Sequence, residues 1–267
     1  MNEILRNLRA GALVLDLGSG SGGSVAREAY PDVRIIRLDN ERPKGVDDFV
    51  VADGARLPFA DHAFDAVIAN HSLEHIAGLD AVLAEIGRVV RAGGSLYVAV
   101  PDASTLSDHI YQWMFHGGGH INPFRSADAL EKQIASATGL RPAGRRVLCT
   151  SLVFLERHRF GPRPPRRLWL FANGHSRFLA WFAYVLRRID FMFGTRLSVY
   201  GWAFYFGNVL EEIDTVPWTN VCVRCGAGQS SASLLANGEV SRRLVSSYHC
   251  SSCGEWNLFT DDRLRFR

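Results

Sequence analysis

The sequence predicts an α/β fold with a mainly parallel sheet flanked by helices, followed by a small C-terminal unit. Short apolar runs alternate with amphipathic stretches of helical period, and the first run, residues 13–17, passes into the glycine-rich stretch 18–23. Four of the five cysteines stand in two CxxC pairs beyond residue 220. With 267 residues, 47% hydrophobic and 21% charged, the chain can hold one full α/β domain and a small appendage.

The first strand and its glycine turn have the sequence VLDLGSGSGG over residues 14–23. Glycine is favoured there because the backbone takes positive φ values and comes close to a ligand. The spacing fits both GxGxG and the dinucleotide pattern GxGxxG, so the glycines alone leave NAD open. Asp16 favours another ligand, because a carboxylate beside a pyrophosphate is unfavourable, whereas S-adenosylmethionine carries an ammonium and a sulfonium and no phosphate. These residues resemble motif I of class I S-adenosylmethionine-dependent methyltransferases.

The next two strands bring further acids to the same edge. After a predicted helix over 22–29, the strand 33–38 ends at Asp39, where a carboxylate can accept hydrogen bonds from both ribose hydroxyls; an Asx turn with Asn40 is the alternative. A short strand over 48–51 leads into residues 52–68, ADGARLPFADHAFDAVI, which match the pattern ADAxxLPFxDxSFDxV of the methyltransferase type 11 family. The resemblance implies that Asp53 accepts from the adenine amino group. The LPF residues can also be a packed loop.

A fourth strand over 65–69 is followed by NHSLEHI, residues 70–76, which resembles the family's LEHI stretch near the methionine part of the cofactor. No (N/D)PPY sequence is present, so methylation of an exocyclic base nitrogen is disfavoured. Glu74 and His75 have a plainer alternative, the pairing of local helix-start donors. The predicted cofactor-binding residues are Asp16, Gly18, Ser19, Gly20, Gly22, Asp39, Asn40, Asp53, Gly54 and Asn70.

The resemblance continues to Pro101 through a predicted helix over 79–90, the pair Gly93-Gly94 and a strand over 96–100. A weaker match follows. The sequence GHINPF, before a predicted helix over 126–138, resembles the GHxxxF element on the family's substrate side. It makes His120 a candidate catalytic base, with a structural histidine as the alternative.

Strands over 145–155 and 199–206 complete a seven-stranded, Rossmann-like methyltransferase sheet, whose last strand is antiparallel in the resembling family. The insertion between them, 157–196, is unusual because 157–189 contains eight arginines, many aromatics and no acid. Its apolar run is too short to span a bilayer. Three roles stay open: a lid over the substrate pocket, contact with a membrane surface, and an RNA-binding face.

The C-terminal cysteines predict a structural zinc ribbon. Cys222, Cys225, Cys250 and Cys253 form two CxxCG knuckles, separated by enough residues for a β-hairpin, and four thiolates would close the coordination of one Zn²⁺. Cys149 is interpreted as a small buried strand residue. The predicted domains are 1–215, which binds S-adenosylmethionine, and 216–267, the ribbon.

These observations predict an S-adenosylmethionine-dependent methyltransferase that acts on a small-molecule, glycan or lipid-linked acceptor, by O-methylation. The alternatives are an RNA methyltransferase, a cofactor-binding adaptor that works through its ribbon, and an NAD-dependent oxidoreductase. A net charge of +3 is too small to imply nucleic acid. Residues 1–10 lack the apolar run of a secretory signal, so we expect a cytoplasmic protein, with peripheral contact at the inner membrane face as an option.

Overall fold

The computed structural model describes residues 1–6, 8–20, 23–43, 49–116, 119–160, 164–242 and 244–261. The chain forms two compact units. The first comprises Met1–Pro101, Gly119–Arg146 and Trp202–Thr215, and the second comprises Asp102–Gly118, Val147–Gly201 and Val216–Arg267.

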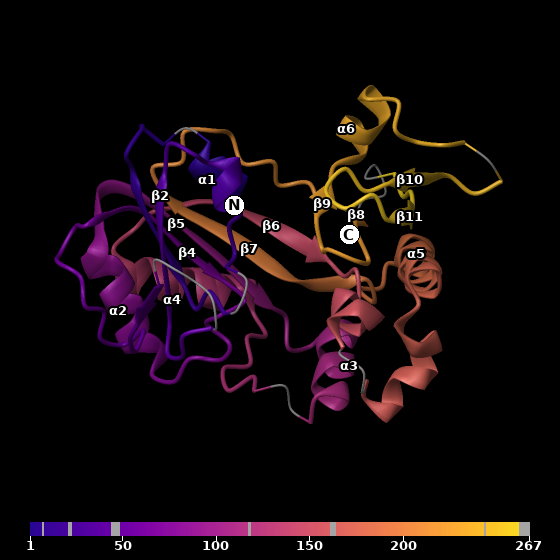
Figure 1. Ribbon diagram of the computed structural model, residues 1–267, viewed down its shortest axis with the longest axis horizontal. Coiled ribbons are helices and arrows are strands. Elements are labelled where there is room, and N and C mark those ends of the chain that lie inside the picture. Colours follow the sequence, from indigo (N-terminus) through magenta and orange to yellow (C-terminus); the bar gives the residue numbers. More distant parts are fainter. Residues whose placement is uncertain are drawn as a thin grey trace. The chain divides into compact units, whose positions relative to one another are not determined.

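One seven-stranded sheet has the strand order β3-β2-β1-β4-β5-β7-β6 (Figure 1). Its strands are β1 Leu13–Leu17, β2 Arg34–Asp39, β3 Phe49–Val51, β4 Phe64–Asn70, β5 Val90–Pro101, β6 Pro142–Cys149 and β7 Val199–Gly207. Neighbouring strands from β3 to β5 are parallel. The predicted seven-stranded, mainly parallel Rossmann-like sheet is therefore confirmed.

Strand β7 runs against its neighbour β5. The Asp102 N–H, after the end of β5, donates to the Tyr200 carbonyl near the start of β7, at 2.9 Å. At the other end, the Asn208 N–H donates to the carbonyl of Gly94, at 3.1 Å. Since the start of one strand lies beside the end of the other, the pair is antiparallel, as predicted.

Two helices of the first unit pack side by side, α2 Leu79–Val89 and α4 Ala127–Thr138 (Figure 1). Their close approach needs a small residue, because a Cβ added at Gly87 would lie 2.7 Å from Thr138 Cα. The apolar stripe of α2 is buried, as its helical period predicts. Four residues precede the sheet as the short helix α1, Asn2–Leu5.

The predicted helix over 22–29 is wrong over the part that the structure describes, where residues 23–30 contain only the 3₁₀ turn η1, Arg27–Ala29. Gly23 has a φ of +70°, outside the right-handed helical region, and the next residue, Ser24, donates its N–H to the Asp16 carboxylate at 2.7 Å. Strand β5 also begins earlier than expected. Val90 pairs with Phe64 of β4 directly after α2, so the glycine pair lies inside the strand.

The sixth strand ends earlier than predicted, at Cys149. Thr150 still donates to the Ser198 carbonyl at 2.7 Å, but Leu152 takes a positive φ of 56° and breaks the extended run. The second unit contains α3 Leu106–Met114, which precedes β6, and the helical elements that follow β6: η2 Val153–Leu155, η3 Arg157–Arg159, η4 Arg166–Gly174, α5 Ser176–Phe193 and α6 Ser231–Ala236. None of the helices in the described ranges is long and apolar enough to cross a membrane.

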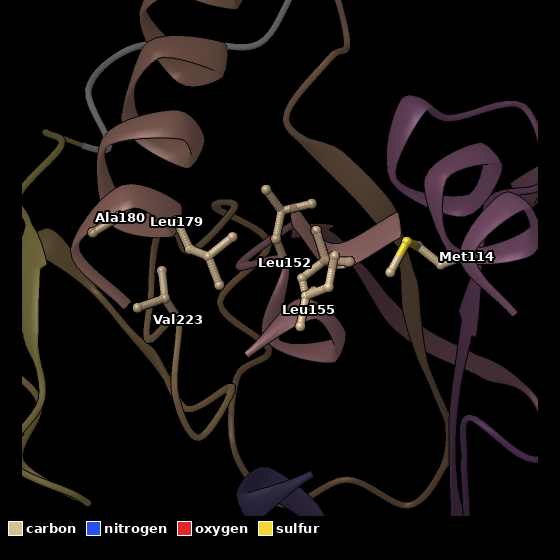
Figure 2. Close-up of a cluster of buried hydrophobic side chains, with 7 residues drawn as sticks. Met114, Leu152, Leu155, Leu179, Ala180 and Val223 are labelled. Atoms are coloured by element: carbon tan, nitrogen blue, oxygen red, sulfur yellow. The ribbon is translucent and has the colours of Figure 1, made fainter. Parts of the chain in front are cut away.

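The second unit has its own hydrophobic core, to which α3, the segment after β6, α5 and the cysteine-bearing tail all contribute. Figure 2 shows Leu179 of α5 and Val223 of the tail directed toward one another beside Leu152 and Leu155. The full cluster is Met114, Leu152, Leu155, Leu168, Leu179, Ala180 and Val223. A unit boundary falls at residue 216, but the tail shares this core; independent folding of 216–267 stays a prediction.

Candidate active site

The glycine turn follows β1 and is fixed to β2. The N–H groups of Gly18 and Ser19 both donate to the Leu38 carbonyl, at 2.8 and 3.1 Å. Gly18, Gly20 and Gly23 have positive φ values, as the sequence predicted. A Cβ at Gly18 would lie 2.3 Å from Ser72 Cβ, so the turn also presses against the loop that follows β4. Gly22 lies outside the described residues.

Asp16 is fully buried at the carboxyl end of β1. One of its carboxylate oxygens accepts from the Ser24 N–H, and the other, Oδ1, has no hydrogen-bond partner in the described chain. Burial raises the pKa of this carboxyl, while hydrogen bonds from Ser24 act in the opposite direction. A cationic group placed beside Oδ1 would offset the cost of keeping this carboxylate charged.

Two further buried polar atoms in the same region lack a protein partner among the residues described. They are Ser19 Oγ in the glycine turn and Ser72 Oγ opposite Gly18. Buried polar groups in native proteins are almost always hydrogen-bonded. This group of atoms therefore fits a polar ligand bound against the turn.

The other predicted cofactor-binding acids lie at the same edge, because parallel strands end together. Asp39 closes β2, and its two oxygens accept from the N–H groups of Gly20 and Asn40, at 2.9 and 2.7 Å. The Asx contact between Asp39 and Asn40 is thus present together with a hydrogen bond from the glycine turn to Asp39. Asp53, after β3, is exposed and accepts from the Ala55 N–H at 2.9 Å. Two further predicted residues are Gly54, buried beside Asp53, and Asn70, half-buried at the end of β4.

The loop 57–61 is fastened to α2 by residues that the sequence analysis missed. The Arg88 guanidinium donates to the carbonyls of Phe59 and Leu57, at 2.8 and 3.1 Å, and pairs with Glu85 at 2.7 Å. Glu85 in turn accepts from the Leu57 N–H. Hydrogen bonds from Arg88 lower the pKa of Glu85. The packed-loop alternative for the LPF residues therefore holds, and the Glu-x-x-Arg spacing on α2 was its sequence signal.

The segment carrying His120 docks on the loop after β4. The N–H groups of Ile121 and Asn122 donate to the Glu74 carbonyl, at 2.8 and 3.1 Å. The ring centroids of His75 and His120 are 4.8 Å apart. The predicted catalytic base thus lies beside the LEHI stretch, and its role stays a prediction.

The four cysteines of the tail converge as predicted. Cys222 and Cys253 have Sγ atoms 3.6 Å apart, as do Cys225 and Cys250, and a tetrahedral zinc site requires about 3.8 Å between sulfurs. Short hairpins close each knuckle, β8 Asn220–Val221 with β9 Gly228–Gln229 and β10 Ser247–His249 with β11 Trp256–Leu258, and α6 Ser231–Ala236 lies between them.

Hydrogen bonds favour the thiolate form of Cys222, which is the form that ligates a metal. The Cys225 thiol, backbone N–H groups and the Asn257 amide lower the pKa of Cys222, against the opposing effect of burial. The Asn257 amide lies 3.5 Å from Cys222 Sγ. The cluster is compatible with a zinc ribbon.

Residues 15–98 match a family model described as a methyltransferase domain. This part of the chain is a methyltransferase domain. The match spans β1 to β5 and includes Asp16, the glycine turn, Asp39, Asp53 and Asn70.

Two curated relatives resemble part of the chain. A demethylmenaquinone methyltransferase from Beutenbergia cavernae is 39% identical over 99 residues, 34% of this chain and 41% of the relative. A malonyl-[acyl-carrier protein] O-methyltransferase from Methylococcus capsulatus is 30% identical over 138 residues, 46% of this chain and 50% of the relative. The chain thus spans half or less of the length of these relatives.

A solved S-adenosylmethionine-dependent methyltransferase from Archaeoglobus fulgidus has the same fold. Its TM-score is 0.50 at 16% identity, and the match covers 76% of this chain and 88% of that one.

Proposed function

We propose that the protein is an S-adenosylmethionine-dependent methyltransferase that methylates an oxygen of a small-molecule, glycan or lipid-linked acceptor. The observation that carries this proposal is the set of unpartnered buried oxygens beside the glycine turn of the methyltransferase domain. Asp16 would face the cofactor's cationic end, Asp39 its ribose and Asp53 its adenine. The turn leaves open space at Gly20, where an added Cβ meets nothing within 4 Å.

The protein's task in such a reaction is positioning. When bound, S-adenosylmethionine supplies an electrophilic methyl group on its sulfonium. The strand-end residues hold the cofactor rigidly, so that the acceptor oxygen can be brought into near-attack geometry with the methyl group. His120 is proposed to take the proton of a hydroxyl acceptor. The two relatives' names give demethylmenaquinone and malonyl-acyl carrier protein as acceptors, and neither is a nucleic acid.

Calorimetry with S-adenosylhomocysteine and NAD tests cofactor choice. We expect binding of S-adenosylhomocysteine only, and Asp53→Ala should weaken it by about 1 to 3 kcal/mol, because a ligand donor loses its acceptor. Asp32→Ala is the matched control, since this exposed acid precedes β2 and lies at the opposite end of that strand from Asp39. NAD binding without a response to S-adenosylhomocysteine would support the oxidoreductase instead.

The acceptor is tested by turnover of S-adenosylmethionine against pools of lipids, glycans and RNA. Methyl transfer to a lipid or glycan pool supports the proposal, whereas transfer only to RNA supports the RNA methyltransferase. Intact S-adenosylhomocysteine binding without any turnover, together with a stoichiometric protein partner, would support the adaptor.

The insertion is proposed to contact anionic membrane surfaces through α5. Its outer face carries Phe178, Trp181, Val185 and Met192, which are 40, 45, 44 and 64% exposed at helical spacing. The opposite face is buried in the core of the second unit. Exposed arginines accompany this apolar stripe: Arg157, Arg159, Arg166, Arg177 and Arg188. Aromatic side chains with a basic surround suit shallow binding at lipid headgroups.

Two residues of the predicted basic aromatic surface belong to the interior instead. Arg187 is 4% exposed and donates to the Thr150 carbonyl at 3.0 Å, and Phe182 packs on the hydrophobic core. The period of α5 turns both toward the core. Arg163 lies outside the described residues. The lid and RNA roles of the insertion stay alternatives.

Vesicle sedimentation tests the membrane proposal. We expect binding that increases with anionic lipid content and decreases in a Phe178→Ser/Trp181→Ser variant, because both side chains are exposed and their loss should spare the core. Leu210→Ser, at an apolar residue that is 65% exposed but lies outside the insertion, should bind like wild type. If wild-type protein stays in the supernatant at low salt while a structured RNA shifts on a gel, the RNA-binding face replaces this proposal.

A further inference from the structure

We propose that Glu74, His75 and His120 form a second divalent metal site, separate from the cysteine cluster. One ligand atom from each residue lies within 4.8 Å of the other two. Two imidazoles with one carboxylate suit zinc or ferrous iron rather than magnesium or calcium, which prefer sites made of oxygen ligands. The sequence did not predict a metal here, because the three residues belong to two motifs far apart in the chain.

The fold builds this site from two distant segments of the first unit. Glu74 and His75 lie in the loop after β4, whereas His120 precedes α4. The Asn122 side-chain amide donates to the carbonyls of Leu73 and Ile76, at 2.7 and 2.8 Å. Together with the bonds from Ile121 and Asn122 to the Glu74 carbonyl, these contacts hold the backbone of both segments in place.

Glu74 supplies the argument for a cation. Its side chain is 1% exposed, and Oε2 has no hydrogen-bond partner in the part of the chain that is described. The other oxygen, Oε1, lies 3.7 Å from His71 Nδ1, beyond ordinary hydrogen-bond distance. A buried carboxylate oxygen without a partner is costly, and a bound divalent ion removes that cost.

His75 has the outer contact expected of a metal ligand. Its Nδ1 lies 3.1 Å from the Gly119 carbonyl and can donate to it, which leaves Nε2 to ligate an ion. The planes of the His75 and His120 rings are inclined to each other by 63°. Ligand atoms of a tetrahedral site stand about 3.3 Å apart, so the cluster must contract slightly. His75 is exposed and His120 half-buried, so side-chain rotation can supply that movement.

Three protein ligands leave a coordination position open, unlike the closed set of four thiolates. An oxygen of the methyl acceptor could fill it, and the ion would stabilise negative charge on that oxygen. This role rests on the proposed methyltransferase function, whereas metal binding itself does not. His120 would then be a metal ligand and could not also act as the free base.

Metal binding tests the site directly. Full-length protein is stripped with a chelator, loaded with Zn²⁺ alone, desalted and analysed for zinc per chain. We expect two equivalents in wild type, one in His75→Ala/His120→Ala and one in Cys222→Ser/Cys225→Ser. His109→Ala, an exposed histidine on α3, is the control and should keep two. One wild-type equivalent that the cysteine variant loses and the histidine variant keeps would overturn the proposal.

Cobalt and cofactor binding separate this proposal from the others. Co²⁺ at the cysteines gives strong thiolate charge-transfer absorption, and a second equivalent should add only the weak bands of a nitrogen and oxygen site, absent in Glu74→Gln/His120→Ala. Calorimetry with S-adenosylhomocysteine on the same samples reports on the fold and on the proposed function. Failure of cofactor binding with two metals bound would reject the methyltransferase alone, and retained cofactor binding with one metal would reject only the second site.

Discussion

Gly18→Ala should disrupt the glycine turn through one identifiable contact. The residue has φ +69°, which costs an alanine about 1 kcal/mol, and its Cβ would lie 2.3 Å from Ser72 Cβ. Overpacking of this kind costs about 1 to 3 kcal/mol more. We therefore expect the stability of β1 to fall by about 2 to 4 kcal/mol, measured by hydrogen exchange of its amides, and binding of S-adenosylhomocysteine to weaken at least tenfold.

Two further variants separate the clash from the backbone strain. Gly11→Ala has a similar φ of +75° but meets nothing within 4 Å, so it should lose only about 1 kcal/mol. In Gly18→Ala/Ser72→Gly the nearest remaining atom of residue 72 is its Cα, 3.5 Å from the added Cβ, which is an ordinary contact. Most of the stability lost to the clash should therefore be recovered. Equal losses in Gly18→Ala and Gly11→Ala, or no recovery in the double variant, would refute this reasoning.

Two other predictions concern the cysteine cluster and the loop 57–61. Cys222→Ser should release zinc, measured as metal lost from the protein. It should also destabilise the second unit, measured by tryptophan fluorescence, because Val223 packs in the same core as Leu179. Cys149→Ala is the control and should keep zinc. Loss of S-adenosylhomocysteine binding in Cys222→Ser would contradict a purely structural ion. Arg88 lowers the pKa of Glu85 in the folded state, so this group stabilises the fold above its unfolded pKa of about 4.3 and loses that contribution as the pH falls through the folded value. In Glu85→Gln, unfolding free energy should therefore fall less between neutral and acid pH, and an unchanged acid profile in urea titrations would be evidence against the role of the pair.

The sequence by itself determined the sheet and the edge at which a ligand can bind. Apolar runs of strand length and helical stretches between them specify a parallel α/β sheet, and Asp16, Asp39 and Asp53 each lie at or just after the end of a predicted strand. Parallel strands end at one edge, so these acids had to meet there. The cysteine spacing likewise specified a four-thiolate cluster, because local CxxCG turns bring each pair together.

Only the tertiary structure decided contacts between residues far apart in the chain. The approach of Ser72 to Gly18, the placement of His120 near Glu74 and His75, and the hydrogen bonds of Arg88 to the loop 57–61 depend on how loops pack. Local pattern also failed at residues 23–30, where Gly23 has a φ of +70°, outside the right-handed helical region, and only the 3₁₀ turn η1 forms. The physical reason is common to all of them: periodicity reports which side of an element is apolar, whereas the partner of each polar atom is set by non-local packing.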